Sequence, residues 1–175
     1  MTQPKHDTPS VQDVALVVGG GPGISSSCAR LFAENGMRVC VAARNPEKAV
    51  LETLEKTHGV RRYACDASEP AAVAQLFGNV VQGIGTPRLV VHNIDGRVPG
   101  IFRKSVIEAD PVMALETLRN SAFSAFLVGQ QAARLMLGNE LDANGAKGTI
   151  IFTNASAALK GFPSSSFPSM SRAAC

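Results

Sequence analysis

Apolar residues in this chain occur in short unbroken runs, and between the runs apolar and polar residues alternate with the period of a helix. The runs predict strands at 14–18, 38–43, 61–65, 88–93 and 149–153, of which the third is the more exposed. The periodic stretches predict helices at 26–35, 46–57, 69–82 and 111–138, with a loop or short helix at 97–110. Strands that alternate with helices are typical of a parallel sheet covered by helices on both faces, an α/β fold.

The first of these runs ends in a cluster of glycines. Residues 14–18 are all apolar, and the sequence then reads GGGPGIS. Gly19 allows a sharp reversal at the strand end, and Gly21 and Gly23 carry no Cβ, so a diphosphate can approach the backbone. A helix that begins at Ile24 aims its free N–H groups at that diphosphate. The pattern predicts a phosphate-binding turn; glycine placed after a buried strand for steric reasons alone is the alternative.

Together with the helix that follows it, this turn resembles the opening of the short-chain dehydrogenase/reductase family. The matching residues are Ala15-Leu16-Val17-Val18-Gly19, Gly23-Ile24-Ser25 and Ala29-Arg30-Leu31-Phe32-Ala33-Glu34-Asn35-Gly36. Val18 stands where the family usually has Thr, and Ser25 stands at its third glycine. The resemblance implies a Rossmann-like doubly wound parallel sheet in three α/β/α layers, with strand order 3-2-1-4-5 and without the last strands of the family.

The end of the second predicted strand bears on the choice of cofactor. An acidic residue there would accept hydrogen bonds from the ribose 2′-hydroxyl of NAD and repel a 2′-phosphate. This chain has Ala43-Arg44 and no acid, and a guanidinium forms paired hydrogen bonds with a phosphate. An arginine at this place resembles the NADP-preferring members of the family. The sequence therefore predicts NADP, and a solvated loop arginine is the alternative.

The resemblance carries further cofactor contacts onto the ends of the third and fourth strands. Asp66 and the backbone of Ala67 take the positions that contact the adenine, although Asp66 or Ser68 can also cap the next helix. The family usually has Asn-Asn-Ala-Gly after its fourth strand, but here only Asn93 is retained, and Ile94 would narrow the cofactor channel. The complete set of expected cofactor contacts is Gly19, Gly21, Pro22, Gly23, Ile24, Arg44, Asp66, Ala67, Asn93 and Ile94.

The family's reaction needs a Tyr hydroxyl that exchanges a proton at the substrate oxygen, helped by a Lys four residues later, a Ser and an Asn. The only tyrosine here is Tyr63, in the third predicted strand. The family pattern places Pro168 at the Tyr position and Arg172 at the Lys position. A register one residue earlier places Phe167 and Ser171 there. Neither register supplies the acid–base group.

The other two catalytic positions are also altered. In the first register Ala155, with Ser156 beside it, takes the Ser position, and Ser121, with Asn120 beside it, takes the Asn position. Ser156 and Arg172 are the candidate catalytic residues that remain. The sequence predicts an oxidoreductase of this family that acts on a carbonyl or alcohol substrate with degenerate catalytic residues. A catalytically inactive NADP-binding or interaction protein on the same fold is the alternative.

Composition limits the other classes of function. The chain has 175 residues, of which 45% are hydrophobic and 18% charged, and we expect one domain over 13–175 behind a disordered tail at 1–12. Its net charge of +3 is too small to imply nucleic acid. No apolar run approaches the ~20 residues of a membrane span, and the polar amino end has no signal-peptide core. We therefore expect a cytoplasmic protein.

The cysteines and histidines show no spacing suited to a metal. Cys28, Cys40, Cys65 and Cys175 lie far apart, as do the three histidines. Because Cys40 and Cys65 fall in predicted buried strands, we expect reduced core thiols and no bound metal.

The resemblance adds two expectations about the whole protein. In the family the helix equivalent to 111–138 packs against a second subunit, so we expect a homodimer or homotetramer through it; a helix mostly buried in the protein's own core is the alternative. The family also has at least two further strand units beyond this point. The domain is therefore expected to be incomplete at its carboxyl end, either as a fragment or as a truncated paralogue.

Overall fold

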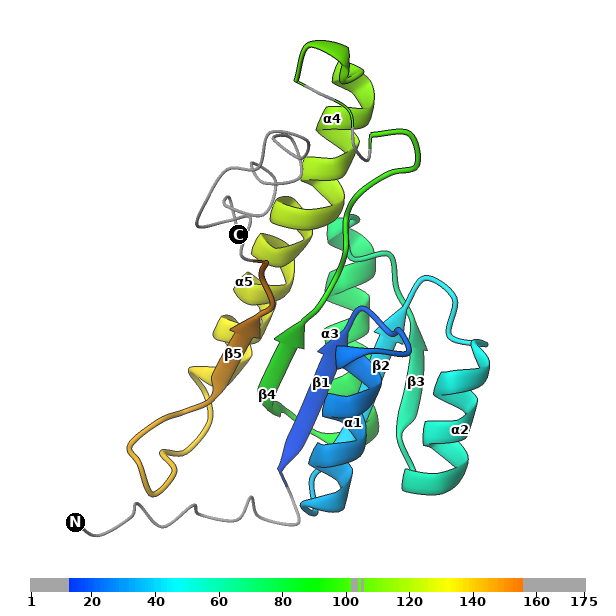
Figure 1. Ribbon diagram of the computed structural model, residues 1–175. Helices are drawn as coiled ribbons and strands as arrows, with labels where there is room; N and C mark the ends of the chain where they lie inside the picture. The colour runs from blue at the N-terminus through cyan, green and yellow to red at the C-terminus, as the bar shows by residue number, and fades with distance from the viewer. Residues whose placement is uncertain (1–12, 102–103, 105, 156–175) are drawn as a thin grey trace, which may run out of the picture.

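The computed structural model describes residues 13–101, 104 and 106–155 (Figure 1). The tail predicted at 1–12 lies outside the described residues, and so does 156–175. The strands are β1 (Val14–Val18), β2 (Arg38–Ala43), β3 (Arg61–Ala64), β4 (Pro87–His92) and β5 (Thr149–Phe152). The helices are α1 (Ile24–Glu34), α2 (Ala49–His58), α3 (Pro70–Ile84), α4 (Pro111–Leu118) and α5 (Ser124–Met136), with a 3-10 turn η1 (Val106–Glu108) and a π-helical turn η2 (Arg119–Phe123). The predicted elements are thus present, with ends that differ by up to three residues.

The strands form one parallel sheet in the order β3-β2-β1-β4-β5, which confirms the predicted topology. The central strand is β1, and Val18 at its end lies opposite Ala42 of β2 and His92 of β4. The carboxyl ends of these three strands are therefore level. The chain leaves β1 toward one side of the sheet and β4 toward the other, so this edge is where a crevice forms in a doubly wound sheet.

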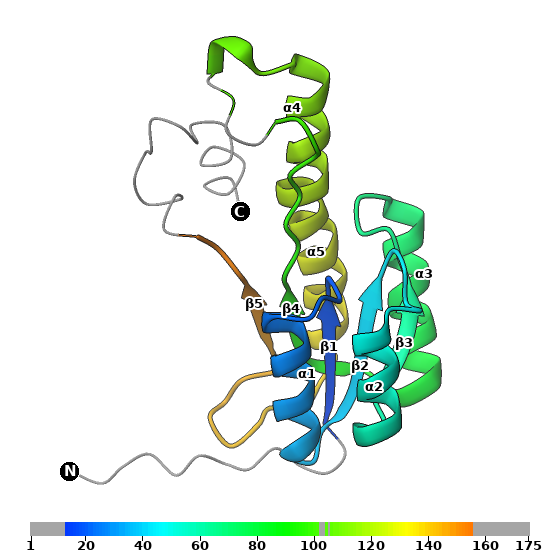
Figure 2. The ribbon, with the colours of Figure 1, turned by 45° about the vertical axis from the view of Figure 1, so that its right-hand side comes forward.

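Alternate residues of the central strand support two separate cores. Leu16 and Val18 pack with Leu76 and Val128, which belong to α3 and α5. Ala15 and Val17, on the other face of β1, pack with Ala29 of α1 and Leu51 of α2. Figure 2 shows the resulting layers, with α1 and α2 on one face of the sheet and α3 and α5 on the other. Because each face is covered, β1 is apolar throughout, which is why its sequence lacks the alternation of a half-exposed strand.

The helix predicted at 111–138 is not mostly buried. It is divided into α4 and α5 by the π-helical turn η2, and it extends past the carboxyl edge of the sheet (Figures 1 and 2). Val128 and Met136 are buried against the sheet, but Leu115, Phe126 and Leu137 are 69%, 57% and 70% exposed. The interpretation of this segment as a core helix is therefore wrong for one of its faces. The opposite face of α5, which carries Val128 and Met136, packs against the sheet and α3.

Three further observations concern expectations drawn from composition. Cys28, Cys40 and Cys65 have free thiols, and the last two are buried, as predicted. Among residues 13–101, 104 and 106–155 there is no group of His, Cys, Asp or Glu arranged to hold a metal ion. Over the same residues, no helix combines the length and apolar character that crossing a bilayer requires.

Candidate functional site

A cavity of about 600 Å³ opens at the carboxyl edge of the sheet, above the ends of β1, β2 and β4. The glycine turn between β1 and α1 forms part of its wall, and the segments that follow β2, β3 and β4 form the rest. Glu116 and Asn120 reach it from α4 and η2. The cavity therefore occupies the crevice in which open α/β sheets bind ligands.

Two of the glycines in the turn are required by packing. Gly19 has a φ of 108°, and a Cβ there would lie 2.1 Å from the carbonyl oxygen of Asn93. A Cβ on Gly20 would lie 2.9 Å from Cδ1 of Leu51 in α2. The N–H groups of Gly19 and Gly20 both donate to the carbonyl of Ala42, at 2.9 and 3.0 Å, which fixes the turn against β2. The steric explanation for glycine after a buried strand is thus correct for these two positions.

The other two glycines have no such packing reason. A Cβ on Gly21 or on Gly23 would meet no atom within 4 Å, and both residues line the cavity. Gly23 is the N-cap of α1, where no side chain caps the helix and the first turn holds no acidic residue. The free N–H groups at this end of α1 are therefore available to an anion. Gly21 and Gly23 leave the approach to them open.

A chain of hydrogen bonds joins α1, β4 and the residue after β5. The hydroxyl of Ser25 donates to the carbonyl of Gly19 and accepts from Nδ2 of Asn93 at 2.7 Å. The hydroxyl of Thr153 donates to Oδ1 of Asn93 at 2.7 Å. Asn93 is thereby held from both sides at the cavity wall. Ser25 stands at the family's third glycine, and its hydroxyl makes two hydrogen bonds that a glycine could not make.

The end of β3 supplies a second part of the wall. Oδ1 of Asp66 accepts hydrogen bonds from the N–H of Ser68 at 3.0 Å and from its hydroxyl at 2.8 Å. The N-cap of α3 is Glu69, which makes no side-chain capping bond, so the alternative that Asp66 or Ser68 caps this helix is wrong. Asp66, Ala67 and Ser68 instead form a local turn beside the cavity.

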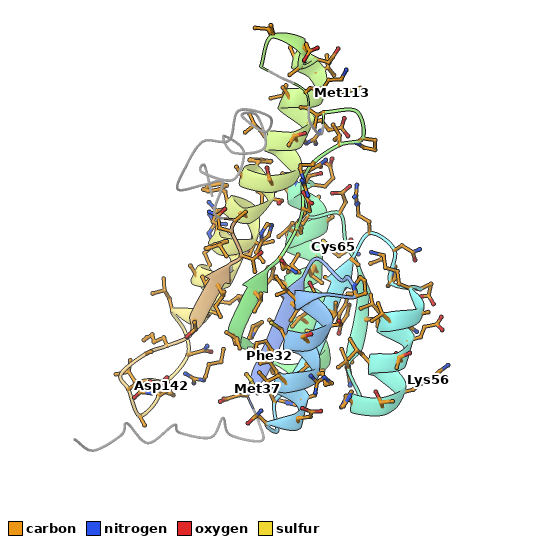
Figure 3. All side chains as sticks on the ribbon, viewed as in Figure 1. Phe32, Met37, Lys56, Cys65, Met113 and Asp142 are labelled. Atoms are coloured by element: carbon orange, nitrogen blue, oxygen red, sulfur yellow. The ribbon has the colours of Figure 1, made fainter. Side chains whose placement is uncertain are left out.

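The electrostatics of this part of the wall keep Asp66 ionised and Cys65 protonated. Partial burial favours a higher pKa for Asp66, but the two Ser68 hydrogen bonds and the charges of Arg44 and Arg119 outweigh it and lower the pKa. Burial raises the pKa of the Cys65 thiol to about 11, with a further contribution from Asp66. Cys65, labelled in Figure 3, is therefore a packing residue and not a nucleophile.

Basic side chains line the cavity next to the end of β2. Arg44 is exposed and follows Ala43, and no acidic residue occupies this strand end. Nζ of Lys48 donates a hydrogen bond to the carbonyl of Gly20 at 2.8 Å, which brings a second positive charge to the glycine turn. Sequence reasoning missed Lys48. Its presence as a second basic residue between β2 and α2, four positions after Arg44, could have marked it as a candidate.

The opposite end of the cavity is lined by residues that follow β4. Ile94 is half-buried there and packs against Gly19, since its Cγ1 would lie 2.9 Å from a Cβ on that glycine. The guanidinium of Arg97 forms an ion pair with the carboxylate of Asp95, with Nε 2.7 Å from Oδ1. This hydrogen-bonded pairing raises the pKa of Arg97. Asp95 and Arg97 were not among the expected contacts.

The residue that reaches the cavity from η2 is Asn120, and not its neighbour Ser121, which the family register placed at the Asn position. Ser121 is buried, and its hydroxyl donates to the carbonyl of Thr117. A Cβ on Gly96 would lie 2.6 Å from the backbone nitrogen of Ser121, so the chain after β4 is in close contact with the backbone of η2. Both residues lie in the π-helical turn η2, and of the two only Asn120 lines the cavity.

The structure brings most of the expected cofactor contacts together. Of the ten residues, only Pro22 is not part of the cavity wall. The lining members are Gly19, Gly21, Gly23, Ile24, Arg44, Asp66, Ala67, Asn93 and Ile94. The candidate catalytic residues Ser156 and Arg172 lie outside the described residues, as does Pro168. Tyr63 lies in β3 and does not line the cavity.

A doubly wound parallel sheet with an open glycine turn at its switch point is the arrangement typical of nucleotide-binding α/β folds. The family model described as enoyl-(acyl carrier protein) reductase matches residues 19–175. This chain belongs to the short-chain dehydrogenase/reductase family, a family of oxidoreductases that use nicotinamide coenzymes.

Individual relatives agree with this assignment. An uncharacterised oxidoreductase of Mycobacterium tuberculosis is 36% identical over 90 residues, which cover 49% of this chain and 34% of that protein. An uncharacterised oxidoreductase of Caenorhabditis elegans is 33% identical over 119 residues, which cover 65% of this chain and 34% of that protein. The chain thus matches about a third of the length of either relative.

Solved structures share the fold. A short-chain dehydrogenase/reductase from Serratia marcescens superposes with a TM-score of 0.77 at 23% identity, over 93% of this chain and 63% of that one. The enoyl-(acyl-carrier-protein) reductase of Anaplasma phagocytophilum, solved in complex with NAD, superposes with a TM-score of 0.78 at 18% identity, over 94% and 62%.

Proposed function

We propose that the cavity binds NADP(H), and that the protein is an oxidoreductase acting on a small carbonyl or alcohol substrate. The observation that carries this proposal is the open glycine turn. Gly21 and Gly23 lack a side chain where nothing else fills the space, and the uncapped end of α1 lies directly behind them. A pyrophosphate is the part of a dinucleotide that fits such a place, because it accepts hydrogen bonds from several backbone N–H groups.

The remaining groups at the cavity suit the other parts of the same ligand. Arg44 has the charge and planar fork to bind a 2′-phosphate, with no acid at the end of β2 to repel it. Asp66, Ala67, Asn93 and Ile94 also line the cavity. By resemblance to the family, we assign the first two to the adenine and the last two to the nicotinamide ribose. When bound, the nicotinamide would supply or accept a hydride. The chain's own residues bind and orient it and exclude water.

The residues at the expected catalytic positions do not favour an ordinary reductase. The only tyrosine of the chain lies in β3 and does not line the cavity. By resemblance, the Tyr and Lys positions fall on Pro168 and Arg172, or on Phe167 and Ser171 in the other register. Loss of a positioned proton donor lowers the rate by roughly two to four orders of magnitude. This observation favours a second candidate function, a catalytically inactive NADP-binding or interaction protein.

We further propose a cytoplasmic protein that assembles as a homodimer or homotetramer through α4 and α5, without nucleic acid or membrane as a partner. The exposed apolar side chains Leu115, Phe126 and Leu137 support an interface on this face. Light scattering after size exclusion would measure the assembly. A monomer at all concentrations would contradict it.

Calorimetric titration with NADPH, NADP, NADH and NAD tests coenzyme binding. The proposal predicts tighter binding of the phosphorylated pair, and loss of that preference in Arg44→Ala. Arg30→Ala is the control, because it removes the same charge from the exposed face of α1, where Arg30 pairs with Glu34. Absence of heat with all four coenzymes would overturn the proposal.

Turnover separates the two candidate functions. Oxidation of NADPH with a panel of ketones, followed by the absorbance of the reduced coenzyme, supports the oxidoreductase. Binding without turnover of any ketone or alcohol supports the inactive binding protein.

A further inference from the structure

The connection between β2 and α2 brings two cations to one corner of the cavity. Arg44 directly follows β2, and Lys48 directly precedes α2 as its N-cap residue. Nζ of Lys48 is held at 2.8 Å from the carbonyl oxygen of Gly20. Gly20 faces α2 and β2, since a Cβ there would meet Leu51 and Val41. The ammonium therefore lies against the glycine turn, and Lys48 lines the cavity together with Arg44 of the same connection.

The acidic residues of the same connection are held elsewhere. Glu47, next to Lys48 in the sequence, forms an ion pair with Nη1 of Arg62 at 3.1 Å. Glu55 of α2 pairs with Nη2 of the same guanidinium at 2.6 Å. Arg62 also donates to the carbonyl of Pro46 at 2.9 Å, which fixes the loop itself. One arginine on β3 thus keeps two carboxylates away from the cations at the cavity.

Within the part of the chain that the structure describes, neither Arg44 nor Lys48 forms an ion pair with a carboxylate. Asp66 is the acid that faces them from the end of β3, and its Oδ1 accepts two hydrogen bonds from Ser68. Arg119 also acts on the charge of Asp66, but its guanidinium forms an ion pair with Glu69 at 2.6 Å. Of the three N–H groups of Lys48, the Gly20 carbonyl uses one, and two remain to donate.

We propose that Lys48 is a specificity-determining residue that binds the 2′-phosphate of NADP(H) together with Arg44. This inference rests on the proposed function, because it requires a dinucleotide in the cavity. A 2′-phosphate carries up to two negative charges at neutral pH, so two cations neutralise it better than one. NADH has no group at that position. Lys48 therefore contributes to the binding of NADPH and not to the binding of NADH.

The test compares Lys48→Met with Lys56→Met. Lys56 lies near the other end of the same helix, is exposed, and is not part of the cavity wall (Figure 3). Dissociation constants are measured by calorimetry for NADPH and NADH, and for two fragments, adenosine 2′,5′-bisphosphate and adenosine 5′-monophosphate. Loss of one charged hydrogen bond should weaken NADPH and the bisphosphate about tenfold in Lys48→Met. NADH and the monophosphate should bind as before, and Lys56→Met should leave all four constants unchanged.

The outcomes distinguish this inference from the proposed function. Equal weakening of NADPH and NADH in Lys48→Met would assign Lys48 to a group that both coenzymes share and would overturn the inference. An unchanged preference for NADPH would also overturn it, while the proposed function would stand. If the wild-type protein binds neither coenzyme, the proposed function fails first and the inference fails with it. Lys48→Arg, which keeps the charge, should retain the preference, and the melting temperature without ligand should match the wild type in all three variants.

Discussion

The side-chain amide of Asn93 donates a hydrogen bond to the hydroxyl of Ser25 at 2.7 Å, across 68 positions of sequence. This contact joins the end of β4 to the first turn of α1, directly beneath the glycine turn. Ser25 is 1% exposed, so water does not compete for the bond. The shape of the candidate coenzyme site therefore depends on a pair of small polar side chains that belong to separate strand–helix units.

Ser25→Ala should lower the free energy of unfolding by about 1–2 kcal/mol, because it leaves the Asn93 amide without this acceptor in a partly buried place. Urea denaturation measures the difference. Ser27→Ala is the matched control in the same helix; its side chain is exposed, and a change within about 0.5 kcal/mol is expected. Equal effects of the two substitutions would show that the buried hydrogen bond contributes nothing particular.

Gly19→Ala should be far more damaging than Gly36→Ala. Both glycines have a positive φ, 108° and 83°, so both variants carry backbone strain of about 1 kcal/mol. Only at Gly19 would the new Cβ also collide with a backbone, at 2.1 Å from the Asn93 carbonyl oxygen, whereas nothing lies within 4 Å of one on Gly36. Melting temperatures should show a small decrease for Gly36→Ala and loss of the folded protein for Gly19→Ala. Similar melting temperatures would contradict the tight packing of the turn.

Gly21→Val should separate folding from binding. No atom lies within 4 Å of a Cβ at this position, so the melting temperature without ligand should stay close to the wild type. The valine side chain would project into the cavity where the proposed pyrophosphate is expected, and both NADPH and NADH should lose at least about tenfold in affinity. If a folded Gly21→Val protein kept its affinity for the coenzymes, the pyrophosphate could not bind at the glycine turn.

His92 should make the stability of the protein sensitive to pH. Its Nε2 lies 2.9 Å from the hydroxyl of Ser124, its ring is 3% exposed, and burial lowers its pKa from 6.5 to about 4. Since the unfolded chain then binds a proton more readily than the folded one, stability is complete above about pH 6.5 and falls as the pH drops toward 4. The loss should reach up to about 3 kcal/mol over that window.

The variant His92→Asn, which replaces the imidazole with a side chain that does not titrate in this range, should flatten the part of the stability curve between pH 6.5 and 4. Urea denaturation at several pH values measures the difference between variant and wild type, so the titration of carboxylates common to both cancels. His58→Asn, near the end of α2 and partly exposed, is the control. Parallel curves for wild type and His92→Asn would contradict a buried neutral imidazole.

The strands of the sheet were predictable because burial leaves a local pattern, and their order was predictable because the chain resembles a known family. Residues 14–18 are apolar without alternation because helices cover both faces of β1, and such a run identifies a central parallel strand. The glycine turn was predictable for a related reason, since Gly19 needs a positive φ and no Cβ. Both features depend on the residue and its immediate backbone.

The side chains that complete the site were less predictable. Nothing local indicates that Lys48 reaches back to Gly20, or that Arg62 holds Glu47 on the far side of the loop. The family register selected Ser121, but of these two neighbours in the π-helical turn only Asn120 lines the cavity. These outcomes depend on how separate elements approach one another, which a pattern within one element does not record.

The sequence by itself determined the alternation of strands and helices, the glycine turn, the basic residue at the end of β2 and the missing Tyr–Lys pair, because each is a property of neighbouring residues. Only the tertiary structure decided which glycines leave space for a ligand, which polar side chains meet across the sheet, and which cations face the cavity without a carboxylate partner among the described residues. Those relationships arise when β1, β2 and β4 end level at one edge of the sheet and bring together side chains that are tens of positions apart in the chain.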